Sequence, residues 1–192
     1  MATHALPYFT PEQYLVFDRS SDTRNEYMFG DILPIEGGTP AHARITANTT
    51  AAFVNRLSSI GCAVYSSSLR VCADSNSAYA YPDLSVVCGN LEYTDAREDT
   101  ITSPKLIVEV LSPSTEDYDL GKKARMYWKI ASLTGLLFID QKKVWIEYWF
   151  RAPGGRWDKQ ELESLNGVLH IESSGADVPV AEIYAGVDLR TA

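Results

Sequence analysis

The chain has 192 residues, of which 45% are hydrophobic and 22% are charged, and its net charge at pH 7 is −8. This length allows a substantial buried core, and the composition excludes wholesale disorder. The acidic charge excludes a general nucleic-acid coat, which needs a basic face, but not a nuclease, because a bound cation supplies positive charge locally.

Targeting signals and cysteine usage both predict a cytoplasmic protein. No apolar run reaches the roughly 18–20 residues that span a bilayer, and Met1–Thr10 lack the basic and apolar regions of a signal peptide. The three cysteines, Cys62, Cys72 and Cys88, form no C-x-x-C motif and lie in or beside apolar runs. We expect core thiols in a reducing cytosol, in preference to a metal or redox role.

The first half of the chain predicts two helices and several short strands. Thr10-Pro11 is typical of a helix start, with a threonine cap and a proline in the first turn. A second helix is predicted over residues 41–59, where apolar residues follow helical spacing, with Gly61 as its stop. The predicted strands and loops are a strand pair within residues 26–35 that turns at Gly30-Asp31, strands at 62–72 and 81–88, and a polar surface excursion at 91–102.

The second half is organised around one apolar run. Residues 105–111 (Lys-Leu-Ile-Val-Glu-Val-Leu) are apolar apart from the first residue and a central glutamate, as in a strand covered on both faces, which implies helices packed on a sheet. A helix is predicted from Asp117 or Asp119 to about Ile130. The remaining predicted elements are strands at 135–140, 144–151 and 156–162, a hairpin turn at 141–143, and a closing segment at 178–184.

This order predicts an α/β (α+β) fold with a mixed central sheet flanked by helices. No internal repeat or linker divides the chain. We therefore predict a single domain over residues 1–192, with a core at about 10–150 and a C-terminal extension at about 151–192.

Glu109 and Asp83 are the leading candidates for chemistry. A carboxylate inside an aliphatic strand is costly unless its charge is paired, so Glu109 coordinates a metal, acts as an active-site acid or forms an ion pair with Lys123 or Arg125. Asp83 follows a proline and by itself is more typical of a turn or cap residue. If their strands are neighbours, the two carboxylates can bind one hard cation, with Mg²⁺ as the default and Mn²⁺ as a substitute.

Three further residues are weaker candidates. Lys123 follows in the predicted helix, where lysine is normally a solvated charge, but beside a metal site its ammonium could stabilise a phosphate. His42 opens the second helix and either orients a water or phosphate or is a partly exposed helix-start residue. Glu26 is either a site acid or a carboxylate at a strand edge.

Other chemistries lack their motifs. The chain has no G-x-S-x-G nucleophile elbow, no P-loop or G-x-G-x-x-G nucleotide cradle, and no Cys/His cluster with zinc spacing. Two carboxylates could serve a glycosidase, but the lysine and the small mixed sheet fit that chemistry poorly.

A set of ordered motifs resembles the Uma-type endonuclease family of the PD-(D/E)XK, or restriction-endonuclease-like, superfamily. The set comprises Pro82-Asp83, Glu109-Val110-Leu111-Ser112-Pro113-Ser114-Thr115, Asp119-Leu120-Gly121-Lys122-Lys123 and Tyr127. It extends upstream to Glu26-Tyr27-x-x-Gly30, His42 and residues 64–67, and downstream to Asp140. The resemblance therefore covers roughly residues 10–150.

The resemblance implies an αβββαβ core and metal-dependent hydrolysis of phosphodiester bonds in DNA. On that pattern Asp83, Glu109 and the carbonyl of Val110 match the metal ligands. The superfamily's lysine normally lies two residues after the second acid, where this chain has Leu111. In Uma-type sequences the lysine moves to the following helix, which favours Lys123, with Lys122 as the alternative.

We expect a Mg²⁺-dependent endonuclease, with two alternatives left open. One is a nuclease fold that binds a partner but cleaves nothing, and the other is a hydrolase of another phosphoester. A homodimer is a further expectation, because nucleases of this type often pair subunits to cut two strands. The aromatic residues Trp145, Tyr148, Trp149 and Phe150 would either line its interface or pack in the core.

Overall fold

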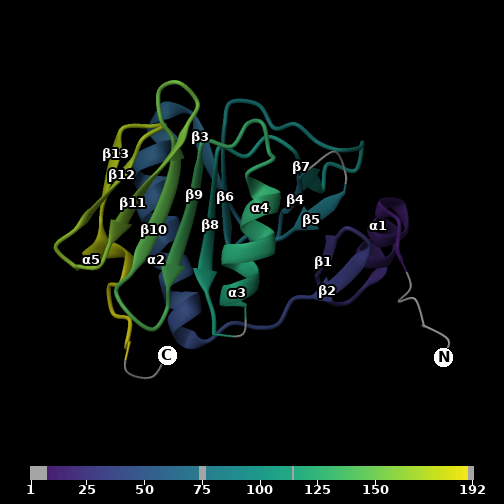
Figure 1. The fold of residues 1–192 in the computed structure, drawn as a ribbon, viewed down its shortest axis with the longest axis horizontal. Coiled ribbons are helices and arrows are strands. Elements are labelled where there is room, and N and C mark those ends of the chain that lie inside the picture. Colours follow the sequence, from purple (N-terminus) through teal and green to yellow (C-terminus); the bar gives the residue numbers. More distant parts are fainter. Residues whose placement is uncertain (1–7, 74–76, 114, 190–192) are drawn as a thin grey trace.

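The structure is a computed structural model that describes residues 8–73, 77–113 and 115–189 (Figure 1). In these residues it contains a six-stranded sheet, a five-stranded sheet and a two-stranded sheet, with helices between and around them. The helices are α1 (Pro11–Ser20), α2 (Pro40–Leu57), α3 (Glu116–Tyr118), α4 (Ala124–Tyr127) and α5 (Val180–Ile183), with a 3₁₀ turn at Ser58–Ile60 and a π-helical turn at Asp119–Lys123. The strands are β1 (Asn25–Met28), β2 (Asp31–Pro34), β3 (Cys62–Ser66), β4 (Arg70–Ala73), β5 (Ala78–Ala80), β6 (Leu84–Cys88), β7 (Thr100–Ile101), β8 (Leu106–Leu111), β9 (Gly135–Asp140), β10 (Ile146–Arg151), β11 (Trp157–Leu162), β12 (Val168–Ile171) and β13 (Ala176–Pro179).

The larger sheet contains the predicted αβββαβ core. Its strand order is β11-β10-β9-β8-β6-β3, with β3, β6 and β8 antiparallel and β9 parallel to β8. Helix α2 precedes β3, and α3 and α4 make the crossover from β8 to β9 that a parallel pair requires. The predicted mixed sheet flanked by helices is therefore confirmed.

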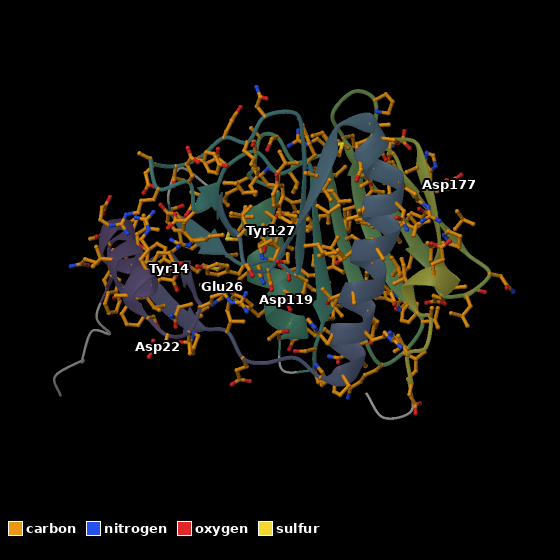
Figure 2. The ribbon with its side chains drawn as sticks, turned by 180° about the vertical axis from the view of Figure 1, so that it is seen from behind. Tyr14, Asp22, Glu26, Asp119, Tyr127 and Asp177 are labelled. Carbon is orange, nitrogen blue, oxygen red and sulfur yellow. A yellow bond between two sulfur atoms is a disulfide. The ribbon has the colours of Figure 1, made fainter. Side chains whose placement is uncertain are left out.

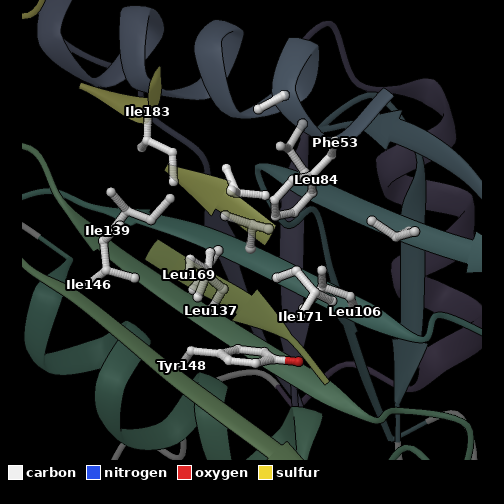
Figure 3. Close-up of a cluster of buried hydrophobic side chains, with 14 of the residues drawn as sticks. Phe53, Leu84, Leu106, Leu137, Ile139, Ile146, Tyr148, Leu169, Ile171 and Ile183 are labelled. Atoms are coloured by element: carbon white, nitrogen blue, oxygen red, sulfur yellow. The ribbon is translucent and has the colours of Figure 1, made fainter. Parts of the chain in front are cut away.

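One face of this sheet packs against α2 and the C-terminal segment. Phe53 of α2 lies among apolar side chains of β6, β8 and β9, and Leu169, Ile171 and Ile183 complete the cluster (Figure 3). Tyr148 of β10 is fully buried on this face. The segment after residue 151, predicted as an extension, thus supplies side chains to the main core.

The opposite face of the sheet packs against the crossover helices and the smaller sheet (Figure 1). The smaller sheet has the order β2-β1-β5-β4-β7 and carries α1 at its far side (Figure 1). Ile107 and Leu111 of β8 point to this face, because side chains alternate along a strand, and they contact the cluster that contains Ala124 and Tyr127. Glu109 lies between them and shares their face.

Local signals placed the helices well. Thr10 caps α1 in a capping box with Gln13, and Thr39 caps α2, whose first residue is Pro40. Gly61 ends the 3₁₀ turn after α2 with a φ of 78°, a left-handed conformation that favours glycine. The helical segment after β8 ends at Tyr127, before the predicted Ile130.

Several strand predictions were wrong in detail. Residues 62–72 form two strands, β3 and β4, which belong to different sheets. The predicted surface excursion at 91–102 contains β7, which is buried and pairs with β4. The first hairpin turns at Phe29-Gly30, both with positive φ, one residue earlier than predicted. Strand β12 was not predicted.

The expectation of core thiols was wrong for two of the cysteines. Cys62 and Cys88 face each other across the antiparallel pair β3–β6 and form a disulfide, whereas the thiol of Cys72 is buried and donates a hydrogen bond of 3.8 Å to the carbonyl of Ala73. The two residues are 26 positions apart, and only the strand register brings their Cα atoms to 4.0 Å. Spacing in the sequence could not reveal this pairing.

Across residues 8–73, 77–113 and 115–189, no helix combines the length and the apolar character that crossing a bilayer requires.

We predict that Phe53→Ala lowers the free energy of unfolding by about 3–5 kcal/mol, because the truncation leaves a cavity in a closed core. Val54→Ala is the matched control, since Val54 is the next residue of α2 and its side chain is 41% exposed. Urea denaturation of both variants measures the difference. Equal stability of the two variants would contradict the packing described here.

Candidate active site

The structure brings Asp83, Glu109 and Lys123 into one cluster. The backbone N–H of Val110 donates a hydrogen bond of 2.8 Å to Oδ2 of Asp83, which places Asp83 against the residue that follows Glu109 in β8. Nζ of Lys123 lies 2.9 Å from Oε1 of Glu109. The residues that the sequence singled out from three separate segments are therefore neighbours in space.

Glu109 lies in the central strand β8 and is almost completely buried. Its side chain is 4% exposed, and burial raises the pKa of the carboxyl group well above its usual range. The charge of Lys123 opposes this shift of the pKa. The ion pair that sequence reasoning left open for Glu109 is formed by Lys123, whereas Arg125 is exposed to solvent.

Lys123 ends the π-helical turn and is 7% exposed. Besides Glu109, its Nζ lies 3.0 Å from Oε1 of Glu26 and 3.6 Å from Oδ1 of Asp119. Burial lowers the pKa of this amine, but the charges of Glu109 and Glu26 outweigh burial and leave the pKa well above its usual value. The neighbouring carboxylates therefore favour the protonated, charged form of Lys123. Lys122, the alternative candidate, is exposed to solvent.

Glu26 joins this cluster from the other sheet. It lies in β1, where it was predicted only as a weak candidate, and is 5% exposed. Its Oε1 accepts a hydrogen bond of 3.1 Å from the backbone N–H of Tyr81, and its Oε2 accepts one of 3.3 Å from the hydroxyl of Tyr118. Both carboxylate oxygens are thus held in place.

His42 lies at the more open side of the cluster, near the start of α2. Its Nε2 is 3.2 Å from Oδ2 of Asp83, and both side chains keep some exposure, 19% and 16%. Burial lowers the pKa of His42, but the hydrogen bond to Asp83 and its charge outweigh burial and raise the pKa above its usual value. His42 belongs to the cluster and is not merely a helix-start residue.

Sequence reasoning missed three contributors: Asp119, Tyr118 and Tyr127. The hydroxyl of Tyr127 donates a hydrogen bond of 2.6 Å to Oε1 of Glu109. Figure 2 shows Glu26, Asp119 and Tyr127 in the same central region of the molecule. The available signal was the spacing of 119, 123 and 127, because residues four apart lie on one side of a helix.

Carboxylates outnumber cations in this cluster. Glu26, Glu109 and Asp119 contact one lysine, and the fourth carboxylate, Asp83, contacts His42. Burial raises the pKa of Asp119 as well as that of Glu109, because buried negative charges lack sufficient partners. Such an excess of oxygen ligands suits a divalent cation. In the part of the chain that the structure describes, however, no three His, Cys, Asp or Glu side chains are grouped so that they could hold a metal by themselves.

Comparison with known proteins identifies the family. Residues 11–179 match the family model described as "Uma2: Putative restriction endonuclease". The chain belongs to this family. It is 32% identical over 181 residues to "Uncharacterized protein slr1290" of Synechocystis sp., covering 94% of each chain. It is 29% identical over 160 residues to "Uncharacterized protein sll1609" of the same organism, covering 83% of this chain and 90% of that protein.

A solved structure shows the same fold. The crystal structure titled "a putative nuclease belonging to DUF820 from Anabaena variabilis" superposes with a TM-score of 0.76 at 12% sequence identity, covering 92% of this chain and 98% of that one. At this identity the likeness concerns the fold. It confirms the architecture that the Uma2 sequence pattern implied.

We predict that Lys123→Met destabilises the protein by about 3–5 kcal/mol, because it leaves Glu109 and Glu26 buried without their cation. Lys122→Met removes the same charge at an exposed neighbouring position and should change stability by no more than about 0.5 kcal/mol. Urea denaturation at neutral pH compares the two variants. A Lys123→Met protein as stable as Lys122→Met would contradict the buried ion pairs.

Proposed function

We propose that this Uma2-family protein is a Mg²⁺-dependent endonuclease that hydrolyses phosphodiester bonds in DNA. Family membership supports a nuclease. The observation that carries the proposal is the convergence of Asp83, Glu109 and Lys123 from separate elements into one buried, carboxylate-rich cluster. An ordinary structural ion pair would need one carboxylate for the lysine, not the three that contact it.

The donor set fits the cation that the family pattern implies. Asp83, Glu109 and the carbonyl of Val110 would hold Mg²⁺ or Mn²⁺, because Mg²⁺ binds through one or two carboxylates and keeps several waters. A ligand set of this size needs no third carboxylate. When bound, the cation would activate a water and neutralise charge on the phosphate.

The remaining residues have distinct tasks in this proposal. Lys123, which keeps its proton, stabilises negative charge on the phosphate oxygens and does not act as a base. Glu26 holds the Lys123 ammonium in place through a contact of 3.0 Å. His42 orients Asp83 and, at the more open side, could donate a hydrogen bond to the phosphate or to a water.

The proposal also covers the substrate, the oligomeric state and the location of the protein. DNA is the proposed substrate, and the cation compensates locally for the net charge of −8. A homodimer and a cytoplasmic location are proposed with it. Tyr148 and Phe150 pack in the core cluster on one face of the sheet, and Trp145 and Trp149 are partly buried against the cluster on the opposite face. A dimer interface at β10 would use the parts of the two tryptophans that remain exposed.

Two rival functions use the same fold. A nuclease fold that binds a partner without cleavage is favoured by how deeply Glu109 and Lys123 are buried, at 3% and 6% exposure, since substrate must reach them. A hydrolase of another phosphoester would keep the cluster and differ only in substrate. Each rival predicts a result for DNA cleavage that differs from the result predicted for the proposed endonuclease.

We predict that the purified protein cleaves supercoiled plasmid with Mg²⁺ or Mn²⁺, and that Asp83→Asn and Glu109→Gln each reduce the rate about 100-fold or more. Lys122→Met, outside the cluster, should retain the wild-type rate. Gel assays with chelator-treated protein, after circular dichroism confirms folding, make the comparison.

Each alternative outcome has a defined meaning. Equal cleavage by wild type and the two acid variants would indicate a contaminating nuclease. No cleavage by any protein, together with turnover of a small phosphodiester, would favour a different substrate. Inactivity on both substrates would favour the non-cleaving binding protein.

A further inference from the structure

The two acids of the candidate site share an asymmetric pattern of contacts. Both contacts to Asp83, from Val110 N–H and from His42, fall on Oδ2. Both contacts to Glu109, from Tyr127 and from Lys123, fall on Oε1. Among the described residues, no hydrogen bond or ion pair reaches Oδ1 of Asp83 or Oε2 of Glu109. Each carboxylate therefore keeps one oxygen available.

Of the two side chains that contact Glu109, only Tyr127 contacts no other carboxylate among the described residues. Lys123 is shared with Glu26 and Asp119, so its position depends on three carboxylates. The hydroxyl of Tyr127, by contrast, lies 2.6 Å from Oε1 of Glu109, the short distance typical of a hydrogen bond to a charged oxygen. No side-chain contact of that hydroxyl to another carboxylate is present in the described residues.

The surroundings fix Tyr127 rigidly. Its side chain is fully buried, and its ring packs in the cluster formed by α4, the large sheet and the smaller sheet (Figure 2). In the contact with Glu109, the Tyr127 hydroxyl is the donor and Oε1 of the carboxylate is the acceptor. Because the ring is held in place, its hydroxyl donates to one defined oxygen of the Glu109 carboxylate, Oε1.

This matters because a glutamate carboxylate rotates easily. Its terminal torsion is broad and roughly two-fold, so the two oxygens of an unrestrained carboxylate exchange places. Hydrogen bonds from outside the ligand set suppress that rotation in metal sites, and their loss typically costs 10–100-fold in metal affinity or activity. Tyr127 is placed to have this effect on Glu109.

We propose that Tyr127 is a positioning residue, whose hydroxyl holds Oε1 of Glu109 and so presents Oε2, together with Oδ1 of Asp83, to a divalent cation. This inference rests on the proposed function, since it concerns the cation of that site. It adds a role that neither the family description nor the acidic motif assigns. Tyr127 itself touches neither cation nor substrate.

Calorimetric titration of the full-length protein with Mn²⁺, without DNA, tests this role. We expect Tyr127→Phe to weaken the Kd for Mn²⁺ by about 10-fold or more. Tyr148→Phe is the matched control, because Tyr148 is also fully buried but its ring lies in the other core cluster, and its Kd should equal that of wild type. Thermal denaturation of each variant confirms that the titrated protein is folded.

A double-mutant cycle separates positioning from a general structural effect. If Tyr127 acts through Glu109, then Tyr127→Phe should change the Kd by no more than about two-fold in a Glu109→Gln background. An equal loss in both backgrounds would overturn the inference, because the effect would then not pass through Glu109.

Two further outcomes distinguish this inference from the proposed function. Wild type that binds Mn²⁺ and a folded Tyr127→Phe variant with the same Kd would overturn the role of Tyr127 and leave the proposed function standing. Wild type that binds no Mn²⁺ would overturn both.

Discussion

The ammonium of Lys123 is the interaction on which the arrangement of the site depends. It joins Glu26, from the smaller sheet, to Glu109, from the centre of the larger sheet, and it is carried by the helical segment between them. All three side chains are almost completely buried, where an unpaired charge costs several kcal/mol. The two sheets and the crossover helix must therefore keep their relative positions for these charges to stay paired.

The same constraint explains why the site is suited to a cation. One lysine cannot balance four carboxylates, and the two acids nearest the open side each keep an oxygen without a contact in the described residues. The π-helical turn at Asp119–Lys123 places its acid and its lysine in this cluster, and one helical turn later Tyr127 contacts Glu109. π-Helical turns are frequent at functional sites. Stability and chemistry thus depend on the same few residues.

Much of the fold follows from local patterns in the sequence. The continuous apolar run of β8 predicted a doubly covered strand, and the helical spacing of apolar residues over 41–59 predicted α2. The division of residues 62–72 between two sheets, and the disulfide between Cys62 and Cys88, depend on long-range register that no local pattern contains. For the site, the buried position of Glu109 predicted a charged partner. The contacts of Glu26 and Tyr127 in the site depend on the packing of segments that are distant in the sequence, so local patterns could not predict them.

The most direct measurement is a crystal structure of the protein soaked with Mn²⁺, examined by anomalous diffraction. The account predicts a single strong anomalous peak beside Asp83 and Glu109, with one oxygen of each carboxylate at about 2.1 Å and with Lys123 and Tyr127 still on the other oxygen of Glu109. A peak elsewhere, or fully soaked crystals with no peak between the two acids, would contradict it.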